Sequence, residues 1–152
     1  CIGISTADCV PVLIHDKVHQ AVAAIHAGWR GTVKRISQNA LSMMHEKYGT
    51  IASDCVAVIG PSISQQAFEV GNEVRIAFEE AGFPTSIIDS TTWTKPHIDL
   101  WAANVYLLEE AGVKLSNIQI ANVCTYVHSD VFFSARKLGI NSGRIYSAIF
   151  LN

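Results

Sequence analysis

The sequence predicts an α/β fold built on a mixed β-sheet that is flanked by helices, and the α+β class fits the same elements. Short apolar runs rich in β-branched residues, typical of strands, interleave with three segments in which apolar residues recur at helical spacing. Two of these runs, 10–14 and 21–25, are separated by the polar connector His15-Asp16-Lys17, which favours a hairpin of adjacent strands. An antiparallel pair among strands that alternate with helices requires a mixed sheet.

The remaining elements follow in a simple order along the chain. Residues 2–5 are expected to form the end of another strand, and a glycine-containing turn over 26–31 leads out of the hairpin. Helices are predicted over three segments with an apolar face: 32–47, 72–81 and 97–111. Further strands are predicted at 55–59, 118–123 and 145–151. The sequence shows no internal repeat and no linker, so residues 1–152 are predicted to form one compact domain.

Composition narrows the class of protein. With 49% hydrophobic and 16% charged residues, the chain can build a substantial core, and no apolar run approaches the roughly 20 residues that cross a bilayer. We therefore expect a cytoplasmic protein with no membrane partner. A net charge of −2 argues against a nucleic-acid partner. Because the chain begins at Cys1, inside an apolar segment and without Met, we expect the N-terminal part of the domain to be missing.

The cysteines are expected to be free thiols. The four residues are scattered and form no CxxC pair, which is typical of a cytosolic protein and not of a disulfide framework: Cys1, Cys9, Cys55 and Cys124. Most single cysteines in a chain of this size are small buried apolar residues. Cys9 and Cys124 stand in sequence contexts that suggest more.

Cys9 and His26 are the strongest candidates for chemistry. Cys9 precedes the first strand of the predicted hairpin and His26 follows the second, so the hairpin folds a thiol and an imidazole toward each other. Two interpretations remain open at this point. The pair can be part of a zinc site, which needs three protein ligands, or Cys9 can be a nucleophile with His26 as its base. In the second case Asp8 is a candidate to orient the histidine.

Two arginines also stand in suggestive positions. Arg30 follows His26 in the glycine-lined turn, and Arg136 follows a Phe-Phe-Ser run. An arginine beside a site can hold phosphate or carboxylate through two parallel hydrogen bonds, although a surface ion pair is the simpler interpretation. His128, a few residues after Cys124, remains open as a site residue.

The whole pattern resembles the YfiH family, also called the DUF152, laccase-domain or peptidoglycan-editing-factor family. The motifs that carry this resemblance are TADCVPVLI, AVAAIHAGWRGTV, IGPSI, FEVGNEV, HIDLWAANVYLLEEAGV and CTY…DVFFSARKLG…SGRIYSAIFL. The resemblance implies a single α/β domain with zinc held by His, Cys and His. Cys9 matches the cysteine of the ADC motif and His26 the histidine of HAGWRG, while the remaining family histidine lies upstream of residue 1.

The resemblance also implies an activity. Members of the family are similar in acting as purine nucleoside phosphorylases on adenosine, inosine or 5′-methylthioadenosine, and in deaminating adenosine. The partners implied are thus a purine nucleoside and phosphate. As hypotheses within this activity, Arg30 and Arg136 hold phosphate and Phe133 stacks on the base. Ser62 or Ser134 bonds a sugar hydroxyl, and Cys124 lines the pocket.

Three other functions are weighed against this one. The fold of the family has been compared with cysteine hydrolases, so a Cys9 nucleophile acting on cell-wall precursors is the main alternative. A copper-dependent polyphenol oxidase is disfavoured, because one Cys/His site suits zinc better than a multi-copper arrangement. A module that binds nucleosides without catalysis is the third. Metal content separates the first two, since a zinc-bound thiolate is not a free nucleophile.

Overall fold

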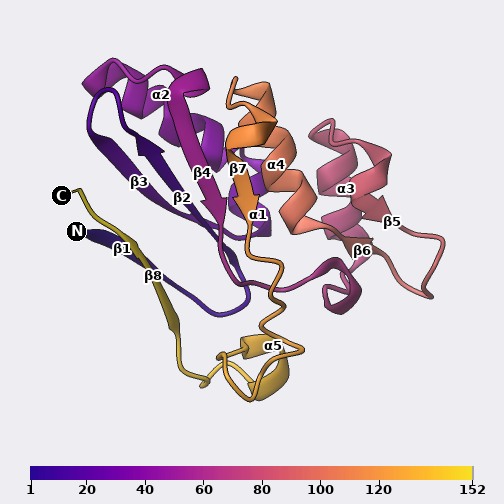
Figure 1. Cartoon of the computed structure of the whole chain (residues 1–152). Coiled ribbons are helices and arrows are strands. Elements are labelled where there is room, and N and C mark those ends of the chain that lie inside the picture. The colour runs from indigo at the N-terminus through magenta and orange to yellow at the C-terminus, as the bar shows by residue number, and fades with distance from the viewer. Residues whose placement is uncertain (152) are drawn as a thin grey trace.

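The computed structural model describes residues 1–151 and has a four-stranded mixed sheet at its centre. The strands lie in the order β3-β2-β4-β7, with these bounds: β2 (Val10–Asp16), β3 (Ala21–Ala27), β4 (Cys55–Ile59) and β7 (Ile118–Ile120). β2 is antiparallel to both β3 and β4, whereas β4 and β7 are parallel. The predicted hairpin and the predicted mixed sheet are both confirmed (Figure 1).

Two smaller sheets accompany the central one. β1 (Ile2–Thr6) and β8 (Ile145–Ile149) form an antiparallel ribbon that joins the two ends of the chain and contacts β3. Figure 1 shows the two termini side by side at one end of this ribbon. β5 (Ile88–Asp89) pairs with β6 (His97–Ile98). The predicted C-terminal strand is therefore confirmed, but it ends at Ile149.

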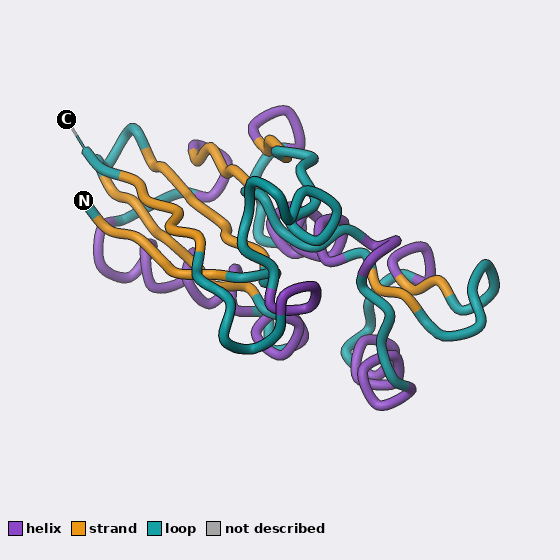
Figure 2. The backbone as a smooth tube through the Cα atoms, turned by 90° about the horizontal axis from the view of Figure 1, so that it is seen from below, coloured by secondary structure: helices purple, strands orange, loops and turns teal. Residues whose placement is uncertain are grey.

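Residues 1–151 contain five α-helices; α2 runs along the sheet in contact with β3, whereas α3 and α5 lie away from it (Figure 1 and Figure 2). Their bounds are α1 (Trp29–Val33), α2 (Ile36–Tyr48), α3 (Asn72–Glu80), α4 (Leu100–Glu110) and α5 (Ala135–Leu138). Four single turns of 3-10 helix occur at Ala52–Asp54, Gln65–Ala67, Thr85–Ile87 and Leu115–Asn117. Within residues 1–151, no helix is long and apolar enough to span a membrane.

The continuous helix predicted over 32–47 is wrong in one respect. Helical structure already begins at Trp29. The helix is then interrupted between α1 and α2, where Arg35 adopts a left-handed conformation with φ of 59°. This conformation interrupts the regular hydrogen-bond ladder, and the Arg35 guanidinium is bonded to Gln38 and Glu110. The predicted stop is confirmed, since Gly49 has φ of 74° and its N–H donates to the carbonyl of His45.

Two other predicted boundaries differ from the structure. The helix expected from His97 begins at Leu100, because residues 97–98 pair with β5 and Asp99 caps the helix by accepting the Ala102 N–H at 2.9 Å. The strand expected over 118–123 ends at Ile120. Asn122 has φ of 54°, which takes the chain out of the extended conformation.

The core lies between the central sheet and the helices that pack on it. Its largest fully buried apolar side chains include Phe78, Ile14, Ile59, Ile98, Leu100, Leu107 and Leu108. The cysteines of residues 1–151 are all free thiols, as predicted, with Cys55 and Cys124 buried and Cys1 exposed. The single apolar core accounts for the compact domain expected from composition.

A buried polar network holds α1 in place. Asn104, on α4, is fully buried; its amide donates to Thr32 Oγ1 at 3.3 Å and to the Leu100 carbonyl at 2.9 Å, and its Oδ1 accepts from Ser37 Oγ at 3.2 Å. Thr32 in turn donates to the carbonyl of Ala27, the last residue of β3. This network ties the turn after β3 to α4, so it fixes the segment that contains His26 and Arg30.

Replacing Asn104 with Ala should lower the free energy of unfolding by about 2–3 kcal/mol, because buried partners on Thr32, Ser37 and Leu100 lose their hydrogen bonds. Urea denaturation followed by circular dichroism measures this change. Asn39→Ala is the control, since Asn39 makes a single exposed bond to the Lys34 carbonyl. Equal stability of the two variants would contradict this account of the network.

Candidate functional site

The β2–β3 hairpin brings Cys9 and His26 to the same end of the sheet. In the pairing register Val10 lies opposite Ala27 and Pro11 lies opposite His26. Cys9, which immediately precedes Val10, therefore lies beside the turn that leaves β3. The thiol and the imidazole meet as the hairpin pattern of the sequence predicts.

The side chains of Cys9 and His26 both lie next to Gly28. A Cβ atom at this position would be 2.9 Å from Cys9 Sγ and 3.8 Å from His26 Nε2. Any larger residue would push into the thiol. The absence of a side chain at residue 28 thus leaves the space in which the sulfur and the ring nitrogen face a common point.

The pair lines an open pocket of about 250 Å³ that also contains a guanidinium group. Arg30 belongs to this pocket, and its Cζ lies 4.2 Å from the centre of the Trp29 ring in a cation–π contact. His26 and Arg30 are exposed, whereas Cys9 is half-buried. A thiol, an imidazole and a cation are consequently available to one small ligand.

Burial raises the pKa of the Cys9 thiol above its ordinary value, and the neighbouring Asp8 carboxylate raises it further. A thiol in such surroundings stays protonated at neutral pH and is a poor nucleophile. Coordination to a cation would displace the proton and form the thiolate. Both a nucleophile and a metal ligand need the thiolate, so the raised pKa by itself does not separate the two roles.

The suggestion that Asp8 orients His26 is wrong. The Asp8 carboxylate accepts hydrogen bonds from Thr125 Oγ1 at 2.8 Å and from the backbone N–H of Arg136 at 2.7 Å, while its carbonyl accepts the Ile63 N–H at 3.0 Å. Asp8 is buried and has φ of 77°. It joins the loop that carries Cys9 to the C-terminal part of the chain.

The two serines predicted to bind the sugar are hydrogen-bonded within the protein. Ser62 is fully buried; its hydroxyl accepts from Trp101 Nε1 at 2.7 Å and donates to the Gly60 carbonyl at 3.1 Å. Ser134 is also fully buried and caps α5 by accepting the Lys137 N–H at 3.2 Å. Binding of a sugar hydroxyl by either serine stays a prediction.

Cys124 lies in a different pocket from Cys9. This pocket has a volume of about 340 Å³ and also contains Ser64 and His128. Burial by itself would raise the pKa of the Cys124 thiol, but hydrogen bonds from Ser64 Oγ and from the backbone N–H groups of Ser64, Val127 and Tyr126 outweigh it and lower the pKa. The contribution of Cys124 to the nucleoside pocket stays a prediction.

The predicted stacking residue, Phe133, is 48% exposed. Its ring covers Gly143, where a Cβ atom would be 2.6 Å from the ring carbon Cζ. The ring is not among the side chains that line the pocket of Cys9 and His26. Stacking of Phe133 on a purine also stays a prediction.

Arg136 lies in a third pocket, of about 300 Å³, together with His97 and Tyr126. One guanidinium nitrogen donates to the Glu69 carbonyl at 2.9 Å, and the group lies 5.4 Å from the centre of the Phe68 ring. The two arginines are therefore in separate pockets. His97, which the sequence places at the start of a helix, is 5% exposed and lies in this pocket.

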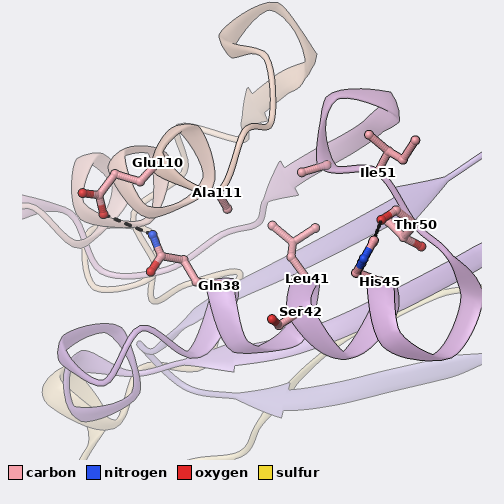
Figure 3. Close-up of a pocket in the computed structure, with 9 residues that line it drawn as sticks. Gln38, Leu41, Ser42, His45, Thr50, Ile51, Glu110 and Ala111 are labelled. Carbon is pink, nitrogen blue, oxygen red and sulfur yellow. Dashed lines mark hydrogen bonds between the residues drawn. The ribbon is translucent and has the colours of Figure 1, made fainter.

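Another pocket, of about 470 Å³, lies between α2 and α4 and contains neither the thiols nor the arginines considered above (Figure 3). Figure 3 shows two hydrogen bonds among its lining residues: Gln38 donates to Glu110 at 3.1 Å, and the His45 ring bonds the Thr50 carbonyl at 2.9 Å.

Cys9 and His26 are two potential zinc ligands, and residues 1–151 contain no group of three or more His, Cys, Asp or Glu side chains that could hold a metal ion. A catalytic zinc site needs three protein ligands. The donor types and the shared space above Gly28 fit a metal, but a third ligand has to come from outside the described residues. Zinc binding stays a prediction.

Comparisons with a family model, with curated proteins and with solved structures all point to the same family. Residues 1–152 match the family described as multi-copper polyphenol oxidoreductase laccase. The chain is 53% identical over its whole length to a purine nucleoside phosphorylase from Bacteroides thetaiotaomicron. Over 98% of its length it is 44% identical to adenosine deaminase RL5 from an unknown prokaryotic organism. The crystal structure of the Bacillus licheniformis protein YfiH superposes on 95% of the chain with a TM-score of 0.88 and 29% identity.

The chain spans just over half the length of the proteins that it matches. It covers 57% of each of the two curated relatives and 55% of the YfiH chain. The similarity extends across the central sheet and the helices around it, which confirms the predicted α/β fold.

Asp8→Asn should lower the free energy of unfolding by about 1–3 kcal/mol, because an asparagine cannot accept both the Thr125 and Arg136 hydrogen bonds through its amide. Asparagine tolerates the left-handed backbone at this position, so the change isolates the lost acceptor. Thermal and urea denaturation measure the effect. Asp130→Asn, at an exposed position, is the control and should leave the free energy of unfolding unchanged. If Asp8→Asn also left it unchanged, the hydrogen bonds of Asp8 to Thr125 and Arg136 would not stabilise the fold.

Proposed function

Since this chain belongs to the laccase-domain family, also known as YfiH or DUF152, we propose that its Cys9–His26 pocket forms part of the active site of a zinc-dependent purine nucleoside phosphorylase that also deaminates adenosine. The observation that carries the proposal is the convergence of Cys9 Sγ and His26 Nε2 on Gly28, beside Arg30. The names of the relatives support the choice of substrates, a purine nucleoside and phosphate.

Cys9 and His26 would hold the metal, together with a third ligand from outside the described residues. Thiolate sulfur and imidazole nitrogen are the preferred ligands of zinc. A bound zinc would supply Lewis-acid activation of water for the deamination of adenosine. The family description refers to copper, but a multi-copper centre needs several clustered ligands, and the described residues contain no group of three or more His, Cys, Asp or Glu side chains that could hold a metal.

Phosphorolysis requires a group that neutralises phosphate. A phosphate oxygen attacks C1′ of the ribose, the bond from C1′ to the base nitrogen breaks, and the products are a sugar 1-phosphate and the free purine. Arg30 is exposed in the same pocket as the ligand pair, and the Trp29 ring holds its guanidinium. A cation at this position would hold the anionic oxygens of the attacking phosphate against C1′, which itself carries positive charge in the transition state.

The alternative is a hydrolase in which Cys9 attacks a cell-wall precursor and His26 takes the thiol proton. It uses the same two side chains, so proximity does not separate it from the first proposal. Alkylation by iodoacetamide discriminates: Cys9 should react rapidly in a free-thiolate hydrolase and slowly when zinc holds the sulfur.

The protein should bind about one zinc per chain and release adenine from adenosine only when phosphate is present. Cys9→Ala and His26→Ala should each lose the metal and the turnover. Elemental analysis by mass spectrometry and chromatography of adenine, inosine and hypoxanthine measure both. Cys1→Ala, which removes an exposed thiol outside the pocket, should keep both properties. Zinc-free protein with full turnover, or no purine product from any nucleoside, would overturn the proposal.

Arg30→Ala should reduce kcat/KM for phosphorolysis by about 10- to 100-fold, because a charge-assisted contact to the reacting groups is lost. Zinc content should stay the same, since Arg30 is not a ligand. Steady-state kinetics with varied phosphate measure the effect. Arg75→Ala serves as the control: this arginine lies on α3 and pairs with Glu79 at 2.5 Å. Equal kinetics for the two variants would remove Arg30 from the site.

A further inference from the structure

A second thiol and a second imidazole line one pocket, separate from the pocket of Cys9 and His26. Cys124 and His128 both line the pocket of about 340 Å³ at the start of α4. The His128 N–H donates to the Cys124 carbonyl at 2.9 Å, so the two residues are joined by one turn with the hydrogen-bond spacing of an α-helix. Side chains four residues apart on such a turn lie on the same side of it. The pocket therefore presents a sulfur atom and an imidazole to one small molecule.

The sulfur of Cys124 is surrounded by hydrogen-bond donors. The backbone N–H of Ser64 lies 3.3 Å from Sγ, and the Ser64 hydroxyl lies 3.2 Å from it. The backbone N–H groups of Tyr126 and Val127, in the turn that follows, also donate to the sulfur. A neutral thiol is a weak acceptor, whereas each donor directed at a thiolate stabilises its charge. The arrangement therefore favours the charged form of the sulfur.

The segment that contains Cys124 is held in place by the loop that follows β4. Ser62 and Cys124 form an isolated parallel bridge, and the Thr125 N–H donates to the Ser62 carbonyl at 3.1 Å. Thr125 is fully buried, and its hydroxyl donates to the Asp8 carboxylate at 2.8 Å. The donors of Ser64 consequently already face the sulfur, and stabilising a thiolate requires no rearrangement.

The carboxylates near this segment are hydrogen-bonded to other groups. Asp99 also lines the pocket, and its Oδ1 accepts the Ala102 N–H at 2.9 Å. The Asp8 carboxylate accepts from Thr125. Among the side chains that line this pocket, all of them in the described part of the chain, His128 is the one that can carry a positive charge, and it is exposed. An imidazolium beside a cysteine favours the thiolate further.

Cys124 differs in this respect from two other cysteines of the chain. Burial raises the pKa of the Cys9 thiol, and burial beside Asp16 and Asp54 raises the pKa of the Cys55 thiol to about 11. The pKa of the Cys124 thiol is lowered instead, because its hydrogen bonds outweigh its burial. Cys124 is therefore more reactive toward oxidants at neutral pH than Cys55.

We propose that Cys124 is an oxidisable thiol that hydrogen peroxide converts to a sulfenic acid in the pocket shared with His128. The thiolate sulfur attacks one peroxide oxygen, which keeps its hydrogen; the S–O bond forms, the O–O bond breaks, and the second oxygen leaves as hydroxide. The sulfur is oxidised by two electrons and the peroxide is reduced by two. The proposal is independent of the proposed function, since neither residue lies in the pocket of Cys9 and His26.

Treatment of the reduced, folded protein with hydrogen peroxide in the presence of dimedone, which traps sulfenic acids, tests this site. Peptide mass spectrometry gives the rate of adduct formation at each cysteine in the same sample. At pH 7 the adduct at Cys124 should form at least about tenfold faster than the adduct at Cys55. The assignment to Cys124 comes from the mass of the modified peptide, so it needs no cysteine variant.

Ser64→Ala removes the hydroxyl donor and keeps the N–H, so it should slow adduct formation at Cys124 about 3- to 10-fold. It should also move the midpoint of the pH profile for iodoacetamide alkylation of Cys124 upward, because the lost donor stabilised the thiolate; a merely structural role for Ser64 would leave that midpoint in place. Ser116→Ala is the matched control, since this exposed serine bonds Asn117 and lies outside the pocket. It should change neither quantity.

His128→Gln should slow adduct formation at Cys124 about 2- to 5-fold, because a side chain that can be positively charged is lost. His128 is exposed, so this variant probes the pocket even if Ser64→Ala destabilises the fold. Two results would overturn the proposal: adduct formation at Cys124 no faster than at Cys55, or a rate at Cys124 that neither variant changes.

Discussion

The pairing register of β2 and β3 is the constraint on which the candidate site depends. Because side chains alternate between the two faces of a strand, a slip of one residue would turn His26 to the opposite face and separate it from Cys9. The apolar side chains of Val12 and Ile14 are fully buried on the core face of β2, and a slip would expose them. Burial of these aliphatic residues thus determines the geometry of the thiol and the imidazole.

Asp8 is a second constraint on the site, because it connects distant segments of the chain. Its carboxylate joins the loop before β2 to Thr125 and Arg136, which lie 117 and 128 residues further along the chain. One buried acceptor therefore brings the C-terminal motif against the motif that contains Cys9. Cys9 and His26 line one pocket, and Arg136 and His97 line another.

Sequence reasoning succeeded where the determinants are local. The hairpin and the meeting of Cys9 with His26 follow from alternating apolar runs and a short polar turn. It failed where contacts with residues far away in the sequence determine the local structure. Arg35 breaks the predicted helix while bonded to Glu110, 75 residues away. His97 was assigned to a helix because its pairing with Glu69 leaves no pattern near it in the sequence. The burial of Ser62 and Ser134 was likewise not visible in the sequence, since their hydrogen-bond partners are set by packing.

The central claim is that Cys9 and His26 act as metal ligands in a phosphorylase site. The chain covers 57% of the length of the two relatives named for these activities, so metal binding has to be measured on this protein. Zinc-edge X-ray absorption of the purified protein is the most direct measurement. The account predicts one sulfur neighbour at about 2.3 Å and nitrogen neighbours at about 2.0–2.1 Å from zinc, with the sulfur shell absent in Cys9→Ala. A zinc signal without sulfur, or a sulfur shell that survives the substitution, would contradict it.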